Sequence, residues 1–205
     1  TNSSTFDKKD TFYIPLFVSA KTVEAVDIPA VDVVRLLFVG KYNSRRKKHL
    51  LLLEALSEII KTNNVYLTIV GSTVFCDKIY QEEINEKIKK LNLKDHVTLI
   101  YDIDPMKMGE LYKEHHAFVL PSIDEPFSIS PLEAMAYSLP VLVTDTNGCQ
   151  FHIQDGKNGY VVKSNDLDSL IYGLRKITNT TTLPSLRHGA ATYTINENNE
   201  VNFLK

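Results

Sequence analysis

The chain has few of the residues that mark several large classes of protein. Its 205 residues include two cysteines, Cys76 and Cys149, and no tryptophan. Two cysteines so far apart give neither a disulfide framework nor a metal-binding pair, so we expect a reducing, cytoplasmic setting. With 23 basic and 25 acidic residues, the chain lacks the basic excess that nucleic-acid-binding proteins usually carry. It also has no apolar run of membrane-spanning length, and its first ten residues are too polar for a signal peptide.

Short apolar runs alternate with longer amphipathic stretches through most of the chain. Near-continuous apolar strands separated by helices predict an α/β domain with a doubly wound, mostly parallel sheet and helices on both faces. The apolar runs predict strands at residues 33–39, 65–70, 97–100, 117–120, 141–144 and 159–162. Helical periodicity predicts helices at residues 46–61, 78–91, 131–138 and 167–177, and a short one beginning at Pro105 behind an Asp104 cap.

This pattern divides the chain into three parts. Residues 32–178 carry the alternation and form the expected domain. Residues 1–31 contain Pro15 and Pro29 and little regular pattern, so we expect a linker or the tail of a preceding domain. Residues 179–205 begin with a polar patch and continue as a weak helical pattern, which predicts a partly helical extension.

The residues that follow each strand are the candidates for chemistry, because ligands of doubly wound sheets bind beyond the carboxyl ends of the strands. No expected strand is followed by GxGxxG, by GxxxxGK[ST] or by GxSxG. The sequence therefore gives no support to an NAD-dependent enzyme, a P-loop ATPase or a hydrolase with a nucleophile elbow.

The junction after the first strand is basic. Lys41 directly follows Gly40, and Lys47 comes six residues later, in the first turn of the expected helix, among three further cations. Cations at a helix N-terminus oppose the helix dipole, and a bound anion such as a diphosphate would remove that conflict. A solvated basic turn is the alternative interpretation.

The junction after the fourth strand is acidic. Glu125 lies in the loop and Glu133 lies eight residues later, in the first turn of the next helix. Ser130 and Glu133 also fit a helix capping box with Pro131 at the first helical position, and Glu125 also fits a solvated loop residue. Placed around the backbone amides of residues 127–129, the two carboxylates suit a ligand that carries both hydroxyl and phosphate groups.

Three segments at these junctions carry a resemblance to a known family. They are Val39-Gly40-Lys41 through Lys47 to Glu54-Ala55-Leu56, then Glu125-x7-Glu133-Ala134-Met135-Ala136, then Asp155-Gly156-Lys157-Asn158-Gly159. In this order and at this spacing, from about Val33 to Ile177, they resemble the retaining group 1 (family 4) glycosyltransferases of the GT-B fold. The resemblance implies a Rossmann-like, carboxyl-terminal domain that binds a nucleotide-sugar donor. It also implies that an amino-terminal acceptor domain precedes residues 1–31.

The resemblance implies a catalytic set of three residues. Lys41 and Lys47 would hold the diphosphate of the donor and stabilise it as it leaves, in the way that preorganised charges act in a dry cleft. Glu125 would face the transferred sugar, orienting its hydroxyls or stabilising positive charge, and would not act as a nucleophile. Lys41 departs from the family, which usually has arginine there, so the grip on the diphosphate is expected to be weaker.

The resemblance also implies a donor-binding set. Glu133 would accept hydrogen bonds from the ribose hydroxyls. The other groups implied are Gly40 and the backbone amides of Phe127, Ser128 and Ile129. Ser128 stands at a usual glycine position, so its loop is expected to be less free to approach the sugar. Residues 148–153 lack the proline and glutamate common there, so no role is assigned to them.

The activity implied is transfer of a sugar, with retention, from a UDP- or GDP-sugar to a glycan, lipid-linked or other acceptor held by the missing domain. No metal or other cofactor is expected. Asp102-Ile103-Asp104 matches the metal-binding Asp-x-Asp of another glycosyltransferase class, but we expect Asp104 to cap a helix. The six histidines lack zinc spacing, and His115 and His116 are expected to end a helix, where positive charge is favourable.

We expect neither a nucleic-acid partner nor a membrane span, and peripheral membrane association stays open. Without an amino-terminal domain, the chain should bind donor but not transfer sugar. One alternative is a non-catalytic sugar-nucleotide-binding module, which the residues at Lys41 and Ser128 motivate. The other is a different GT-B enzyme, such as a sugar-nucleotide epimerase or a phosphorylase, although no pyridoxal lysine context is found.

Overall fold

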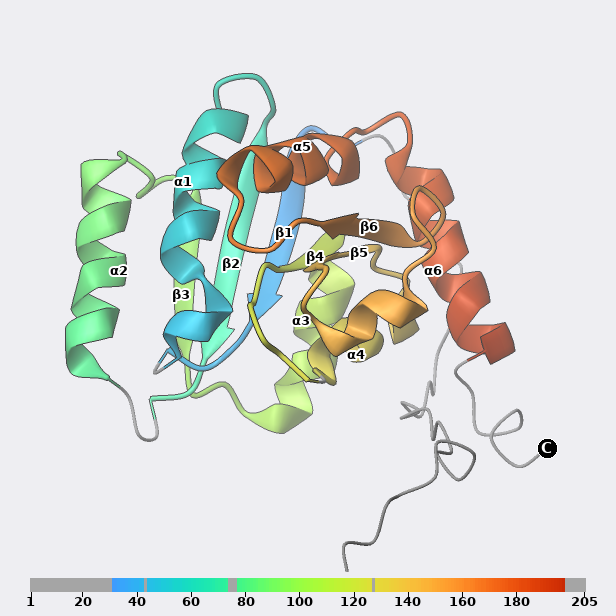
Figure 1. Cartoon of the computed structure of the whole chain (residues 1–205), viewed down its shortest axis with the longest axis horizontal. Coiled ribbons are helices and arrows are strands. Elements are labelled where there is room, and N and C mark those ends of the chain that lie inside the picture. The colour runs from blue at the N-terminus through green and yellow to red at the C-terminus, as the bar shows by residue number, and fades with distance from the viewer. Residues whose placement is uncertain (1–30, 43, 74–76, 127, 198–205) are drawn as a thin grey trace, which may run out of the picture.

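The computed structural model describes residues 31–42, 44–73, 77–126 and 128–197. These residues form one parallel sheet of six strands in the order β3-β2-β1-β4-β5-β6 (Figure 1). The strands are β1 (Val34–Val39), β2 (Val65–Gly71), β3 (Val97–Tyr101), β4 (Ala117–Leu120), β5 (Val141–Thr144) and β6 (Gly159–Val162). The predicted parallel α/β architecture is confirmed, and each predicted strand lies within one residue of the observed bounds.

Helices cover both faces of this sheet. They are η2 (Arg45–Lys47), α1 (His49–Ile59), α2 (Lys78–Lys90), η3 (Pro105–Lys107), α3 (Met108–Glu114), α4 (Ser130–Ala136), η4 (Gly148–His152), α5 (Leu167–Ile177) and α6 (Leu183–Glu197). In Figure 1, α1 and α5 lie in front of the sheet and α3 lies behind it. α1 packs against both α2 and α5, while α4 packs against α6. Within the described ranges, no helix is long and apolar enough to cross a membrane.

The sheet is buried on both faces, as the apolar runs require. Every residue of β4 and β5 is buried, and β1 pairs with β2 in register from Val34 opposite Val65 to Val39 opposite Val70. Gly71 ends β2 because a side chain would not fit there. A Cβ on Gly71 would lie 2.5 Å from the carbonyl oxygen of Gly40 and 2.6 Å from the ring of Tyr42. The carboxyl ends of β1 and β2 therefore approach closely.

The chain between β1 and α1 differs from its prediction. A helix was expected from Arg46, but a short 3₁₀ turn holds Lys47, and α1 begins only at His49. Lys48 between them has a left-handed backbone with φ of 58°. Two other predicted helix starts are confirmed, because Asp104 accepts a hydrogen bond from Met106 N at 3.0 Å and Asp166 accepts one from Ser169 N at 2.9 Å.

Helix α6 packs along the body of the domain. Its buried positions follow one helical face, at Leu183, Leu186, Arg187, Ala190, Ala191 and Thr194. Arg187 donates from Nη1 to the carbonyl oxygens of His115 at 2.9 Å and His116 at 3.3 Å. These bonds tie α6 to the start of β4. The helical pattern looked weak in the sequence because two of the six buried positions are polar.

Candidate functional site

The loops that follow β1 and β4 meet at the carboxyl edge of the sheet, because these two strands are neighbours. Lys47 donates from Nζ to Glu125 Oε2 at 2.7 Å, and the two side chains are 16% and 14% exposed. The backbones join as well, since Ile123 N donates to Arg46 O at 2.8 Å. The structure thus brings together two of the predicted catalytic residues, which lie 78 positions apart in the sequence.

Glu125 is held by its backbone against the residues that follow β5. Its N–H donates to Thr146 O at 3.2 Å, and its carbonyl accepts from Gly148 N at 2.8 Å. Glu125 and Asn147 form an isolated parallel bridge in this way. The carboxylate therefore extends from a backbone that two loops fix.

Gly40 leaves room for the ring of Phe38 at the end of β1, next to the Lys47 side chain. A Cβ on Gly40 would lie 2.9 Å from the ring of Phe38 and 3.5 Å from Cδ of Lys47. Lys41 is exposed and does not enter the Lys47–Glu125 contact. It lines a cavity of about 470 Å³, together with Gly40, Ser72 and residues of the loop after β3. The first, second and third strands all end at this cavity.

Glu133 lies in the first turn of α4, on a different set of contacts. Tyr112 of α3 donates its hydroxyl to Glu133 Oε2 at 2.9 Å, and burial together with this carboxylate raises the pKa of Tyr112. The ring of Tyr137 stacks on that of Tyr112 at 5.2 Å. The alternative interpretation of Ser130 as the N-cap of a capping box does not hold, because Ile129 occupies the N-cap position and α4 begins at Ser130. Glu133 therefore has a side-chain partner in α3 instead.

Three residues between Glu125 and Glu133 were predicted to donate backbone amides to the ligand, and the structure describes two of them. Ser128 is buried, and its hydroxyl donates to Asn147 Oδ1 at 3.1 Å. Ile129 is 49% exposed at the N-terminus of α4. Phe127 lies outside the described residues.

A buried histidine, His49, lies directly after the basic turn that carries Lys47. His49 is fully buried among the rings of Phe38, Tyr42 and Tyr80, and this burial lowers its pKa to about 3. Tyr42 donates its hydroxyl to Ile69 O at 2.9 Å and to Ile100 O at 3.3 Å, which ties the loop after β1 to β2 and β3. The turn that carries Lys47 is thus followed directly by a buried aromatic cluster.

The histidines at the end of α3 do not carry the charge that their position suggested. Burial lowers the pKa of His115, and it lowers that of His116 to about 4. Their Nδ1 atoms bond with backbone, His115 with Leu111 O at 2.6 Å and His116 with Arg35 N at 2.9 Å. The expectation of favourable positive charge at this helix end is therefore wrong, because both rings are neutral at pH 7.

The Asp-x-Asp tripeptide serves local structure. Asp102 accepts from Thr73 N at 2.7 Å, from the Thr73 hydroxyl and from the Ser72 hydroxyl, and these bonds lower its pKa. Asp104 caps η3. Among the described residues, no group of three or more His, Cys, Asp or Glu side chains could hold a metal ion.

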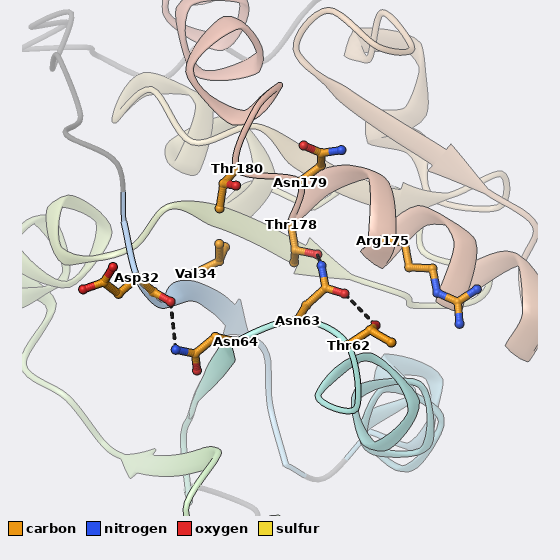
Figure 2. A pocket seen from close by; sticks show the side chains of 9 residues that line it. All are labelled: Asp32, Val34, Thr62, Asn63, Asn64, Arg175, Thr178, Asn179 and Thr180. Carbon is orange, nitrogen blue, oxygen red and sulfur yellow. Dashed lines mark hydrogen bonds between the residues drawn. The ribbon is translucent and has the colours of Figure 1, made fainter.

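A second hollow, of about 290 Å³, lies at the opposite end of the sheet, where β1 and β2 begin (Figure 2). Several of its polar side chains bond one another or nearby backbone. Asn63 donates to the Thr178 hydroxyl at 3.3 Å, and Asn64 donates to Asp32 O at 2.8 Å. No predicted site residue lines this hollow, so the candidate site remains at the carboxyl edge.

Two contributors to the site were not found from the sequence. Tyr112 and Asn147 act by contacting residues on other elements, and neither belongs to a motif of its own. Tyr112 reads as an ordinary apolar position of a helix, and Asn147 reads as a turn residue. Only the packing of α3 on α4, and of the loop after β5 on the loop after β4, reveals their roles.

A comparison with models of protein families identifies the family of this chain. The model for "Glycosyl transferases group 1" matches residues 29–195. The chain belongs to this family. The glycosyltransferase match includes all six strands, most of α6 and both loops that bear Lys47 and Glu125.

Among curated relatives, the glycosyltransferase chain is 35% identical over 133 residues to spore coat protein SA of Bacillus subtilis, covering 62% of this chain and 34% of that protein. It is 29% identical over 129 residues to the O-antigen chain mannosyltransferase RfbU of Salmonella typhimurium, covering 58% and 36%. The chain thus spans about a third of the length of these relatives.

Solved structures agree on the GT-B fold. A glycosyltransferase from Rickettsia africae superposes with a TM-score of 0.82 at 20% identity, over 97% of this chain and 55% of that one. HepE from Anabaena, solved in complex with UDP and glucose, superposes with a TM-score of 0.74 at 19% identity, over 84% and 46%. At these identities, the likeness establishes the fold of a Rossmann-like half.

Proposed function

We propose that this chain is the carboxyl-terminal, donor-binding half of a retaining family 4 glycosyltransferase. In this proposal it binds a UDP- or GDP-sugar, and the complete enzyme transfers the sugar to a glycan or lipid-linked acceptor. The observation that carries the proposal is the Lys47–Glu125 contact at 2.7 Å, placed at the carboxyl edge of the sheet. Doubly wound sheets bind their ligands at this edge. HepE, which shares the fold, was solved with UDP-glucose.

We assign different parts of the donor to different residues along the carboxyl edge of the sheet. Lys47 and Lys41 supply positive charge for the diphosphate, and the cavity of about 470 Å³ beside Lys41 has room for the nucleoside. Glu133, oriented by Tyr112, accepts from the ribose hydroxyls with its second oxygen. Glu125 faces the sugar. As the diphosphate leaves, the lysines stabilise its growing negative charge, and Glu125 stabilises the oxocarbenium-like sugar.

We further propose that donor binding requires no metal ion. The two carboxylates of the Asp-x-Asp tripeptide already have partners, because Asp102 holds Ser72 and Thr73 while Asp104 caps η3. Lysine side chains at the diphosphate supply the charge that a divalent cation would otherwise bring.

Transfer is favoured over the alternatives because several relatives are named as transferases, among them a mannosyltransferase and D-inositol 3-phosphate glycosyltransferases. Neither a binding module nor an epimerase gains support from a contact in the site. The cytoplasmic setting also remains a proposal, supported by Cys149, a buried free thiol whose pKa burial raises.

Calorimetry with UDP, GDP and their sugars tests the site. We expect binding without metal, weakened by Lys47→Ala and by Glu133→Ala. Lys61→Ala is a matched control, because Lys61 forms an exposed ion pair with Glu58 on α1 and should leave affinity unchanged. If the chain bound none of these nucleotides, the proposed donor site would be refuted. Binding that needs manganese and disappears in Asp102→Ala would refute the metal-free proposal.

A further inference from the structure

The side chain of Asn147 joins the two flanks of the Glu125 loop. It is fully buried just after β5. Its Nδ2 donates to Ser122 Oγ at 3.0 Å, and its Oδ1 accepts from Ser128 Oγ at 3.1 Å and from Cys149 N at 2.9 Å. Ser122 and Ser128 lie three residues before and three residues after Glu125. One amide therefore ties down both sides of the loop.

The contacts around Asn147 centre on Glu125. The backbone of Asn147 bridges Glu125 itself, through the bonds of the neighbouring residues Thr146 and Gly148. An amide buried as completely as that of Asn147 needs its hydrogen bonds to be made, and the side chain makes three. Ser128, which departs from the family's usual glycine, supplies one of these bonds through its buried hydroxyl.

We propose that Asn147 is a positioning residue that sets the Glu125 carboxylate against Lys47 and the transferred sugar. The Lys47–Glu125 part of this inference stands on geometry alone, and the sugar part rests on the proposed function. Loss of the Asn147 side chain removes the bonds to Ser122 and Ser128 while the backbone bonds of Glu125 remain, so we expect the loop to shift enough for the carboxylate to leave its hydrogen bond with Lys47. Its contacts with the sugar then weaken, while the groups that hold the diphosphate stay in place.

Asn147→Ala is compared with Asn158→Ala in the full chain. Asn158 is a matched control, because it is equally buried and its side chain also bonds backbone, at Gln154 N (2.7 Å) and His152 O (3.0 Å). Both variants lose a buried amide, so both should lower the melting temperature by similar amounts. They differ in that Asn158 does not contact the Glu125 loop.

The first readout is the ¹⁵N–¹H NMR signal of the Lys47 ammonium group, which the nearly buried bond to Glu125 should protect from exchange with water. We expect the signal to persist in Asn158→Ala and to disappear in Asn147→Ala. Ser122→Ala/Ser128→Ala/Asn147→Ala removes the serine hydroxyls left without a partner and should regain stability without regaining the signal. Asn147→Asp keeps the acceptor oxygen and should retain it. Persistence of the signal in Asn147→Ala would overturn the inference.

The second readout is calorimetric. We expect Asn147→Ala to reduce the affinity for a sugar nucleotide about fivefold relative to its nucleoside diphosphate, the effect of losing about one hydrogen bond. UDP-glucose with UDP, and GDP-mannose with GDP, are the probes. Equal effects in Asn147→Ala and Asn158→Ala would also overturn the inference. Failure of the unaltered chain to bind any nucleotide would instead refute the proposed function, and the ammonium signal would still decide the role of Asn147.

Discussion

Replacing Glu125 by glutamine should make the chain bind UDP or GDP more tightly. In the structure, Glu125 is bonded to Lys47 at 2.7 Å, so under the proposed function a diphosphate competes with this carboxylate for the same ammonium group. Glutamine still accepts a hydrogen bond but carries no charge. Both the competition and the repulsion between the carboxylate and the diphosphate are thereby reduced.

The size of the gain follows from the charges. Two oxygens that share one ammonium group lie about 5 Å apart, and two like charges at that spacing repel by about 3 kcal/mol at an effective dielectric constant of about 20. The side chains are 16% and 14% exposed, so water and salt screen part of this energy. Taking about half gives roughly 1.5 kcal/mol, which corresponds to slightly more than tenfold tighter binding. The free chain should lose about 1 kcal/mol of stability, because the charge-assisted bond becomes neutral.

The assay is calorimetric titration of Glu125→Gln beside Glu83→Gln. Glu83 is a matched control, because it pairs with Arg45 of the same basic turn at 2.6 Å, yet these side chains are 57% (Arg45) and 35% (Glu83) exposed. Glu83→Gln should change the affinity less than about twofold, as surface ion pairs contribute little. The difference between the variants should shrink at high salt. Unchanged or weaker binding in Glu125→Gln at both salt concentrations would refute the competition for Lys47.

Three further predictions concern stability. Lys48→Gly removes a side chain from a left-handed residue at φ 58° and should raise the free energy of unfolding by about 1 kcal/mol. Glu86→Gly, in the exposed middle of α2, is the control and should lower the free energy of unfolding by about the same amount. Urea denaturation of both variants checks the two signs. His49 has a folded pKa of about 3, so its contribution to stability is complete above about pH 6.5 and is lost as the pH falls toward 3. Melts of the unaltered chain should show a loss of about 2 kcal/mol from this residue at pH 5, and His49→Leu should show a shallower dependence on pH. Arg187→Ala leaves two backbone carbonyls without their donor and should cost about 2 to 4 kcal/mol, so an unchanged melting temperature would mean that α6 contributes little.

The strands were predictable from sequence because their burial on both faces leaves an apolar run and a clear stop. Val65–Val70 ends at Gly71, and the structure shows why a side chain is excluded there. The start of α1 was not predictable in this way. Lys48 has a left-handed backbone, and its Nζ donates to Asn165 Oδ1 at 2.8 Å. Asn165 is distant in sequence, so no local pattern reveals this contact.

The site was predictable where it depended on strand ends and not where it depended on cross-element contacts. Lys47 and Glu125 each follow a strand, and parallel neighbours bring such residues to one edge. The alternative capping box at Ser130 does not form, because the helix is capped one residue earlier, at Ile129, and Glu133 instead accepts a bond from Tyr112, which lies 21 positions away. Burial likewise determined the charge of His116, and no local pattern in the sequence reveals that burial.

The Lys47–Glu125 pair has a consequence for the order of events, given the proposed function. A nearly buried ammonium group without a partner is costly, so Glu125 stabilises Lys47 before a donor arrives. A diphosphate that takes over Lys47 leaves Glu125 without its counter-charge, beside the position of the sugar. A carboxylate in that condition favours positive charge nearby, which is the charge that an oxocarbenium-like sugar develops. In the complete enzyme we therefore expect Glu125→Gln to bind the diphosphate more tightly and to transfer sugar more slowly, because the charge that competes with the diphosphate also stabilises the transition state.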